Sequence, residues 1–470
     1  MRGCDAVFPC FHEVVSAVPD HDRYPTLDEL ETSSDRFAAV HSDVDLWQAG
    51  ASRAGHPICC LEVPGGPLQA LLVGMPHPEE PVGALVLEYL LPLLADGLAE
   101  ELGYGFSVVK AGDPDAMRLN EPWFAEPYDL AGFLLRAYRP PLADQFEWTF
   151  PVEYKRYGFT RPLPEARAVM EVVHRRPLDL YMGLHNANFS GAYFYISHED
   201  DVLQRQLAAV MTAAGLPPHC GEPEAPYLQT LAEGVFRSFT LADDYDYYEA
   251  YGADPAVLLT CGTSSDAYAE SVWDCFTLVA EVPYFTSGRI ADTNPAGLTR
   301  GEAKLRGLEV QERLAAWLLD LYVEAAPYLT GETPWQRTVH AYLSSIKDDI
   351  RAERAQVATE PEFAREATVA QLFDSLYLRE LDALSRVGQF ANMLAAEPEQ
   401  SDVLADLQTR AEARVRERAP QLASAGGLEP VPIRSLVQCQ LAALLCSLVA
   451  VRERYRPAHP RPPAPRIVLG

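Results

Sequence analysis

The sequence predicts an α/β protein with a mixed, mostly parallel central sheet flanked by helices, and an all-helical extension after it. Short apolar runs that stop at turn residues precede stretches of helical spacing, as where Gln69–Gly74 is followed by Val82–Leu98. From Glu302 onward the spacing of apolar residues is helical almost throughout. We therefore divide the chain into a lead segment 1–43, an α/β domain 44–330, a helical extension 331–456 and a Pro-rich tail 457–470.

Apolar runs bounded by turn residues define the strands of the α/β domain. They predict a strand–turn–strand unit over Trp47–Val63 and single strands over Gln69–Gly74, Phe106–Lys110, Leu178–Asn186, Ala192–Ser197 and Phe276–Phe285. Helical spacing predicts helices over Val82–Leu98, Glu165–His174 and Asp200–Ala214. Asn120–Arg161 is rich in Pro and aromatic residues with weak periodicity, so we expect loops around the mouth of a cleft.

Helical spacing continues through the last third of the chain. Glu302–Tyr328 is predicted to be one long helix that covers the sheet. Further helices are predicted over Trp335–Val357, Phe363–Leu394, Val403–Ser424 and Ile433–Tyr455. The nearly apolar stretch Ser435–Val451 is shorter than about 20 residues and is interrupted by Gln438 and Gln440, which favours a packed helix over a membrane span.

Charge and cysteine content limit the partners and the compartment. The chain has 38 Lys and Arg against 67 Asp and Glu, a net charge of −29, which repels phosphate backbones and anionic membrane surfaces. We therefore expect neither nucleic acid nor a membrane as a partner. The N-terminus lacks the basic start and unbroken apolar run of a secretory signal, and the nine cysteines are scattered. Together these features predict a cytoplasmic protein with reduced thiols.

The residues that follow three predicted strands suggest a metal site. His77 and Glu80 lie three residues apart in a Pro-flanked turn, and His185 stands at the end of another predicted strand. Two imidazoles and a carboxylate are the protein ligands of many catalytic zinc sites, and ligands gather at the carboxyl ends of strands in open α/β sheets. We predict one Zn²⁺ per chain on these residues. Glu281, the one ionisable residue in an apolar strand, would act as the general base and acid.

These motifs resemble the zinc carboxypeptidases of the funnel-shaped α/β type. The resemblance extends over roughly Val44–Tyr328. Two of the similar segments are motifs, the Gly-x-Ser-x-x-Gly-x-Pro-Ile turn Gly50–Ile58, with His56 in place of Arg, and the His-x-x-Glu motif Pro76–Gly83. The others are the turn Asp113–Ala116, the helix start Pro164–Ala166, the strand end Leu184–Asn186, and Ala280–Val282 with the catalytic Glu. The resemblance implies a zinc-dependent amide hydrolase.

The substrate clamp of that family is altered in this sequence. Glu147-Trp148-Thr149-Phe150 stands where the family usually has Asn-Arg-Asn-Phe, so the residues that clamp a terminal carboxylate are missing. Arg139 or Arg136 is expected to polarise the scissile carbonyl, and the sequence leaves the choice between them open. The residues expected to bind substrate are Glu147, Trp148, Asn186, Asp266 and Tyr268, the last as a substitute for the family's capping Tyr.

The sequence therefore predicts a zinc-dependent hydrolase that cleaves an amide or peptide bond in a small peptide or an acylated amino compound. One alternative is a deacylase like the desuccinylase and aspartoacylase relatives, which share the ligand triad. Another is a non-catalytic binding or scaffold protein on the same fold, whose helical extension mediates assembly or a homo-oligomer. Glu222 and Glu224 are interpreted as solvated loop acids, with contact to a substrate amine as the alternative.

Overall fold

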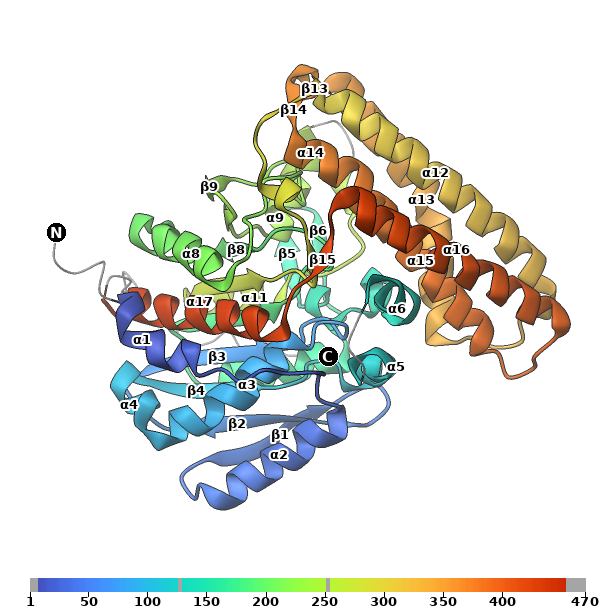
Figure 1. Ribbon diagram of the computed structural model, residues 1–470. Helices are drawn as coiled ribbons and strands as arrows, with labels where there is room; N and C mark the ends of the chain where they lie inside the picture. The colour runs from blue at the N-terminus through green and yellow to red at the C-terminus, as the bar shows by residue number, and fades with distance from the viewer. Residues whose placement is uncertain (1–6, 126–128, 251–253, 454–470) are drawn as a thin grey trace.

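The computed structural model describes residues 7–125, 129–250 and 254–453, so the predicted Pro-rich tail lies outside the described residues. A nine-stranded sheet runs through the protein in the order β1-β2-β4-β3-β7-β11-β8-β10-β9 (Figure 1). Its strands are β1 (Asp45–Ala51), β2 (Pro57–Val63), β3 (Leu68–Gly74), β4 (Tyr104–Val109), β7 (Leu180–His185), β8 (Tyr193–Ile196), β9 (Thr230–Ala232), β10 (Val235–Arg237) and β11 (Phe276–Glu281). The four central strands β4, β3, β7 and β11 are parallel, whereas β2 and β8 join them antiparallel. The predicted mixed, mostly parallel sheet is confirmed.

Helices cover both faces of the sheet, which explains why the central strands are apolar without interruption. In β3, Ala70 and Leu72 pack into the core on one face, and Leu71 and Val73 pack into the core on the other. The first face is covered by α3 (Val82–Leu93), α8 (Asp201–Ala214) and α17 (Ile433–Glu453), and the second by α7 (Pro164–Arg175) and α11 (Ser265–Trp273).

The stretch predicted as loops, Asn120–Arg161, contains regular structure. Asp129 caps a short helix, α6 (Leu130–Arg136), by accepting a hydrogen bond from the Gly132 N–H, and a hairpin follows. The Pro residues on either side hide this helix in the sequence pattern. The remaining elements before β11 are α1 (Val7–Ser16), α2 (Leu27–Val40), η1 (Leu94–Leu98), α4 (Ala99–Leu102), α5 (Pro114–Phe124), η2 (Leu142–Asp144), η3 (Phe146–Trp148), β5 (Val152–Tyr154), β6 (Tyr157–Phe159), α9 (Leu241–Ala250) and α10 (Pro255–Leu258).

Residues 300–426 form a separate layer of helices, here called the helical region, beside the sheet (Figure 1). Its helices are α12 (Arg300–Ala325), α13 (Pro334–Thr359), α14 (Val369–Phe373), α15 (Arg379–Ala395) and α16 (Asp402–Gly426), with two short 3₁₀ helices, η5 (Ala326–Tyr328) and η6 (Pro361–Ala364), and a π-helical segment, η7 (Asp374–Leu378), between α14 and α15. The expectation that the first long helix covers the sheet is wrong, because α12 packs on α13 and α15. The helix that does cover the sheet is α17, whose sides are apolar almost all round. The helical region thus begins before residue 331 and ends before α17.

The segment that leads into the helical region and the segment that leads out of it lie side by side. After η4 (Gly288–Ala291) the chain reaches β13 (Pro295–Thr299), which pairs with β14 (Glu366–Thr368) inside the region. Just before η4, β12 (Phe285–Thr286) pairs antiparallel with β15 (Glu429–Pro430), the segment that returns to the sheet. The region also packs on α6 through α15 and α16. It is therefore held to the sheet at two places.

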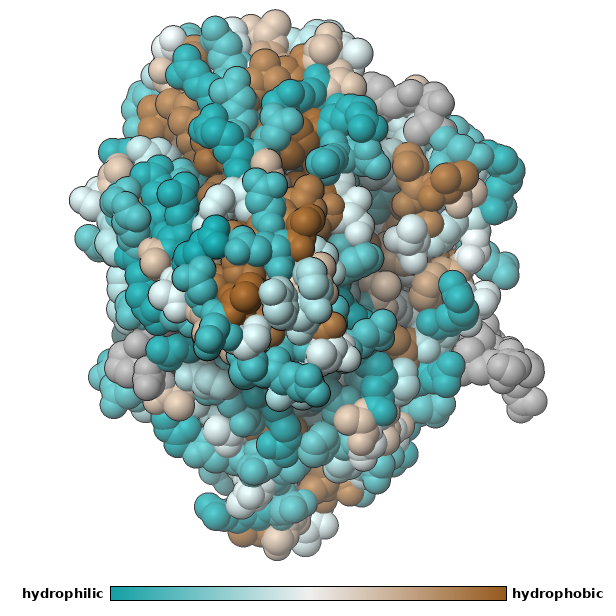
Figure 2. All heavy atoms as spheres, turned by 90° about the vertical axis from the view of Figure 1, so that its right-hand side faces the viewer, coloured by the Kyte–Doolittle hydropathy of each residue, from teal (hydrophilic) through white to brown (hydrophobic). Residues whose placement is uncertain are grey.

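The outer face of the helical region is mostly hydrophilic, with hydrophobic side chains gathered in grooves between polar ridges (Figure 2). One groove runs between α12 and α16 and contains Leu314 and Trp317, and another between α12 and α13 contains Leu319 and Ile346. The homo-oligomer expected through this region stays a prediction.

Two helical stretches, Val82–Leu102 and Ile433–Glu453, are long and apolar enough by composition to cross a membrane. Within the protein, 56% and 83% of their most apolar windows are buried. Their packing on the sheet accounts for their composition.

Gly388 lets α15 approach α6 closely. A Cβ atom added there would overlap the carbonyl oxygen of Leu134. We expect Gly388→Ala to lower the free energy of unfolding by about 1–3 kcal/mol, because this overlap outweighs the gain in helix propensity. Chemical denaturation measures the difference. Gly288→Ala is the control, since nothing lies within 4 Å of its added Cβ, and an unchanged midpoint for Gly388→Ala would show that the two helices move apart freely.

Candidate metal centre

Three neighbouring parallel strands bring the predicted site residues to one edge of the sheet. His185 at the end of β7 is paired in register with Glu281 at the end of β11, and Leu184 is paired with Gly74 at the end of β3. The turn after β3 carries His77 and Glu80. It closes with a hydrogen bond of 3.1 Å from the backbone N–H of Glu80 to the carbonyl of His77.

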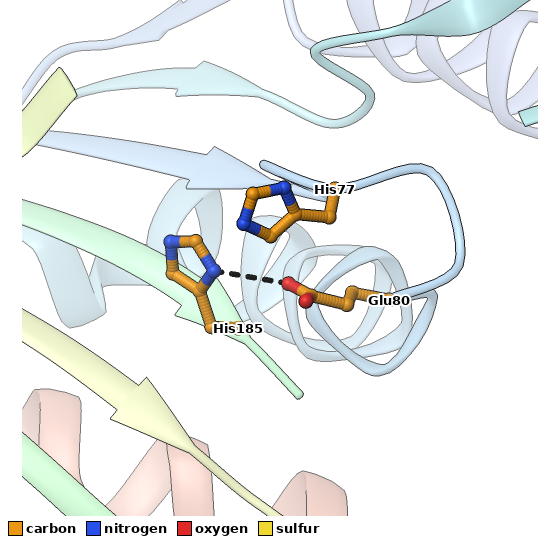
Figure 3. A group of neighbouring side chains, drawn as sticks. All are labelled: His77, Glu80 and His185. Atoms are coloured by element: carbon orange, nitrogen blue, oxygen red, sulfur yellow. Dashed lines mark ion pairs between the residues drawn. The ribbon is translucent and has the colours of Figure 1, made fainter. Parts of the chain in front are cut away.

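His77, Glu80 and His185 point toward one another (Figure 3). Their possible ligand atoms all lie within 4.8 Å of one another, and Nδ1 of His185 is 3.0 Å from Oε2 of Glu80. All three side chains are buried, with exposed fractions of 4%, 1% and 5%. The structure therefore brings the three predicted ligands together.

The donor atoms of this group fit a bound cation. His77 Nδ1, Glu80 Oε2 and His185 Nδ1 are each buried without a hydrogen-bond partner among the described residues. Buried polar atoms nearly always have a hydrogen-bond partner, and here two of the three, Nδ1 of His185 and Oε2 of Glu80, are in ion-pair contact only with each other, so the group indicates a ligand that completes it. Two imidazoles and one carboxylate match the donor set of catalytic zinc.

Burial sets the protonation of the site. It lowers the pKa of His77, with Arg139 and His185 acting in the same direction, so the imidazole is neutral, as metal binding requires. Burial raises the pKa of Glu80, against the opposing effect of Arg139. Burial likewise raises the pKa of Glu281, partly opposed by His185 and reinforced by Glu80. A carboxyl group with a raised pKa suits a general base that must later give up its proton.

Two cavities adjoin the three ligands, and Arg139, Glu224 and Glu281 line both of them. The large cavity, about 570 Å³, lies between the sheet edge and the helical region and is lined by Glu80, Asn186, Lys304, Arg379, Arg386 and Gln389 among others. The small cavity, about 90 Å³, is lined by Glu147, Trp148, Tyr195, Phe239 and Asp266 together with two of the ligands, His77 and His185.

Of the two candidate arginines, the structure places Arg139 at the site. Its Nη1 lies 2.8 Å from Oε1 of Glu79 and 3.3 Å from Oε1 of Glu80. Its backbone carbonyl accepts hydrogen bonds from Thr338 Oγ1 at 3.2 Å and from Gln389 Nε2 at 3.4 Å, so the helical region holds it in place. Arg136 lies on α6 and lines neither of the two cavities.

The residues predicted to bind substrate are divided between the cavities. Glu147, Trp148 and Asp266 line the small cavity, and burial raises the pKa of Glu147 to about 7. Asn186 lines the large cavity, and its Nδ2 donates to the Val282 carbonyl at 3.1 Å.

Tyr268 is not brought to the centre. Its hydroxyl lies 3.0 Å from His174 Nε2, and its ring packs against Phe150 in the core under α7 and α11. Tyr268 lies on the face of α11 that packs against this core, and it therefore lines neither cavity.

Sequence reasoning missed Gln440, a fully buried residue of α17. Its Nε2 donates to the carbonyl of His185 at 2.6 Å and to the carbonyl of Ala280 at 3.3 Å. It therefore ties together the ends of the two strands that carry a predicted ligand and the predicted general base. The signal was an amide in the middle of an apolar helix, because a buried amide needs a partner.

No protein-family model and no curated protein matches the chain. Among solved structures it is similar to carboxypeptidase A from Helicoverpa armigera, with 12% identity over 60% of this chain and 71% of that one and a TM-score of 0.37. It is also similar to metallo-carboxypeptidases from Burkholderia cenocepacia and Pseudomonas aeruginosa, each with 16% identity over 55% of this chain and 60% of the other, and TM-scores of 0.32 and 0.35.

Replacing Gln440 by Leu removes the donor to two buried carbonyls. We expect Gln440→Leu to lower the free energy of unfolding by about 1–3 kcal/mol and to weaken retention of zinc, because the ends of β7 and β11 lose their shared anchor. Denaturation with and without zinc measures both effects. Gln438→Leu, on the same helix but bonded to the Val15 carbonyl, should leave zinc retention unchanged. Equal zinc retention by the two variants would contradict this role.

Proposed function

We propose that the protein is a zinc-dependent hydrolase that cleaves an amide or peptide bond in a small peptide or an acylated amino compound. The observation that carries the proposal is the buried group of His77, Glu80 and His185, whose orphaned donor atoms lie beside Glu281 and two cavities. A structural zinc site has four protein ligands, whereas a catalytic site has three and keeps one position open. Three ligands next to open space favour the catalytic kind.

The roles of the residues follow from their places. A zinc ion held by the two imidazoles and Glu80 would lower the pKa of a water molecule and polarise a carbonyl group. The carboxylate of Glu281 would accept a proton from the attacking water and then deliver this proton to the leaving nitrogen. Arg139, held by Glu79, would stabilise the negative charge that develops on the carbonyl oxygen.

The deacylase remains the second candidate because of what lines the small cavity. By the resemblance, Glu147 and Trp148 stand where carboxypeptidases have a cationic clamp, and Arg139, which lines the same cavity, is already paired with Glu79 and Glu80. An acylated amine without a terminal carboxylate fits these residues better.

Metal analysis tests the first part of the proposal. Purified protein supplied with zinc should hold about one zinc per chain, and a chelator should lower its thermal midpoint, because the buried donors lose their partner. His77→Ala should abolish the zinc. His340→Ala, on the exposed side of α13, is the control. Protein that is equally stable without metal, or a His77→Ala variant that keeps its zinc, would favour the scaffold alternative.

The second part depends on Glu281. Glu281→Gln should keep its zinc but lose hydrolysis by about 100-fold or more, because the amide cannot take up the proton. Turnover is measured on a panel of dipeptides and N-acylated amines, with zinc content determined on the same samples. Glu171→Gln, exposed on α7, is the control. Turnover retained by Glu281→Gln would reject this role.

A further inference from the structure

The small cavity contains a buried carboxylate that lacks a cation. Glu147 is 2% exposed, and its Oε1 accepts hydrogen bonds from the Ser265 N–H at 3.1 Å and the Ser265 hydroxyl at 2.7 Å. Its Oε2 is buried without a hydrogen-bond partner, and no Lys or Arg among the described residues forms an ion pair with it. An unpaired buried carboxylate is costly, so a bound partner that supplies positive charge would stabilise it.

Aromatic rings form another wall of the same cavity. The ring centroids of Trp148 and Phe239 are 6.3 Å apart, and those of Phe239 and Tyr195 are 5.6 Å apart. All three residues line the cavity. The faces of aromatic rings attract cations, and walls that combine rings with carboxylates are the usual surroundings of a bound ammonium group.

Further carboxyl groups of the cavity act in the same direction. Asp266, Glu224 and Glu281 add three carboxyl groups, and Glu224 is fixed by hydrogen bonds of 2.7 Å from the hydroxyls of Tyr193 and Tyr195. The guanidinium of Arg139 also lines the cavity, but it is already paired with two other glutamates. A ligand carboxylate that does not reach the metal would therefore lie among these carboxyl groups and be repelled.

We propose that the small cavity binds an ammonium or guanidinium group on the amine portion of the substrate and rejects a carboxylate at that place. The volume of about 90 Å³ suits one small charged group at the end of a short chain. This inference deepens the proposed function. It rests on that function only in assigning the positive group to the amine portion of the substrate. The substrate class is then an acylated or peptidic compound whose leaving amine carries a second, positively charged group.

A matched set of ligands tests the preference without turnover. The mono-methanesulfonamide of 1,4-diaminobutane and the methanesulfonamides of pentylamine and 5-aminopentanoate share a chain of four methylene groups that ends in an ammonium, a methyl and a carboxylate group respectively, and the sulfonamide resists hydrolysis. Titration calorimetry on the zinc-loaded wild-type protein gives the three dissociation constants. We expect the ammonium compound to bind about tenfold or more tightly than the methyl compound, and the carboxylate compound to bind weakest.

Variants identify the group responsible. Glu147→Gln keeps an oxygen that accepts from Ser265 and should remove most of the preference for ammonium while leaving the methyl compound unaffected. Glu171→Gln, whose side chain is exposed on α7, should change neither. The ligand order in the wild-type protein decides the matter even where a variant does not fold.

Equal binding of the three ligands, or tightest binding of the carboxylate, overturns the inference. The result is separate from hydrolysis. A preference for ammonium in a protein that cleaves no amide would support the cavity and reject the proposed function, and cleavage without such a preference would do the reverse.

Discussion

The parallel pairing of β7 with β3 and β11 is the constraint on which the candidate site depends. Because the three strands run in the same direction, the chain leaves all of them at one edge, and the register places His185 beside Glu281. A slip of one residue would turn His185 to the opposite face of the sheet. At these strand ends Gln440 of α17 donates to the carbonyls of His185 and Ala280, and buried carbonyls need such donors.

An excess of buried carboxylates surrounds this edge. Glu79 and Glu80 share the guanidinium of Arg139, while Glu147 forms no ion pair with a Lys or Arg of the described chain. Such groups repel one another and lower the stability of the protein without ligands, but they increase its affinity for a cation by the same interactions. The helical region contributes through Thr338 and Gln389, which hold the backbone of Arg139. A region outside the sheet therefore helps to position a charge at the centre.

The site residues at strand ends were predictable from the sequence, including His185 and Glu281 far along the chain, whereas the features that depend on how helices pack were not. His77 and Glu80 follow an apolar run that marks a strand end, so both their proximity and their chemistry are evident from the sequence. Helical spacing shows that a segment is a helix but not what it packs on, which is why α12 and α17 exchanged their expected places. The sequence also does not show which face of a helix is buried, which is why Tyr268, expected at the substrate site, packs against Phe150 in the core instead. The predicted mixed sheet survived because strand direction follows from the alternation of strands and helices.

The placement of α17 on the sheet has a consequence for how the protein is made. The carbonyls of Ala280 and His185 accept hydrogen bonds from Gln440 of α17, a helix that begins roughly 150 residues after β11. At synthesis rates of 5–20 residues per second, that separation corresponds to about 8–30 seconds. During that time the apolar face of the sheet beneath α17 has no cover, while the helical region emerges and can form its own contacts first. The candidate centre is then among the last parts of the described chain to reach its final geometry, so its donors stay apart until the surrounding fold is nearly complete.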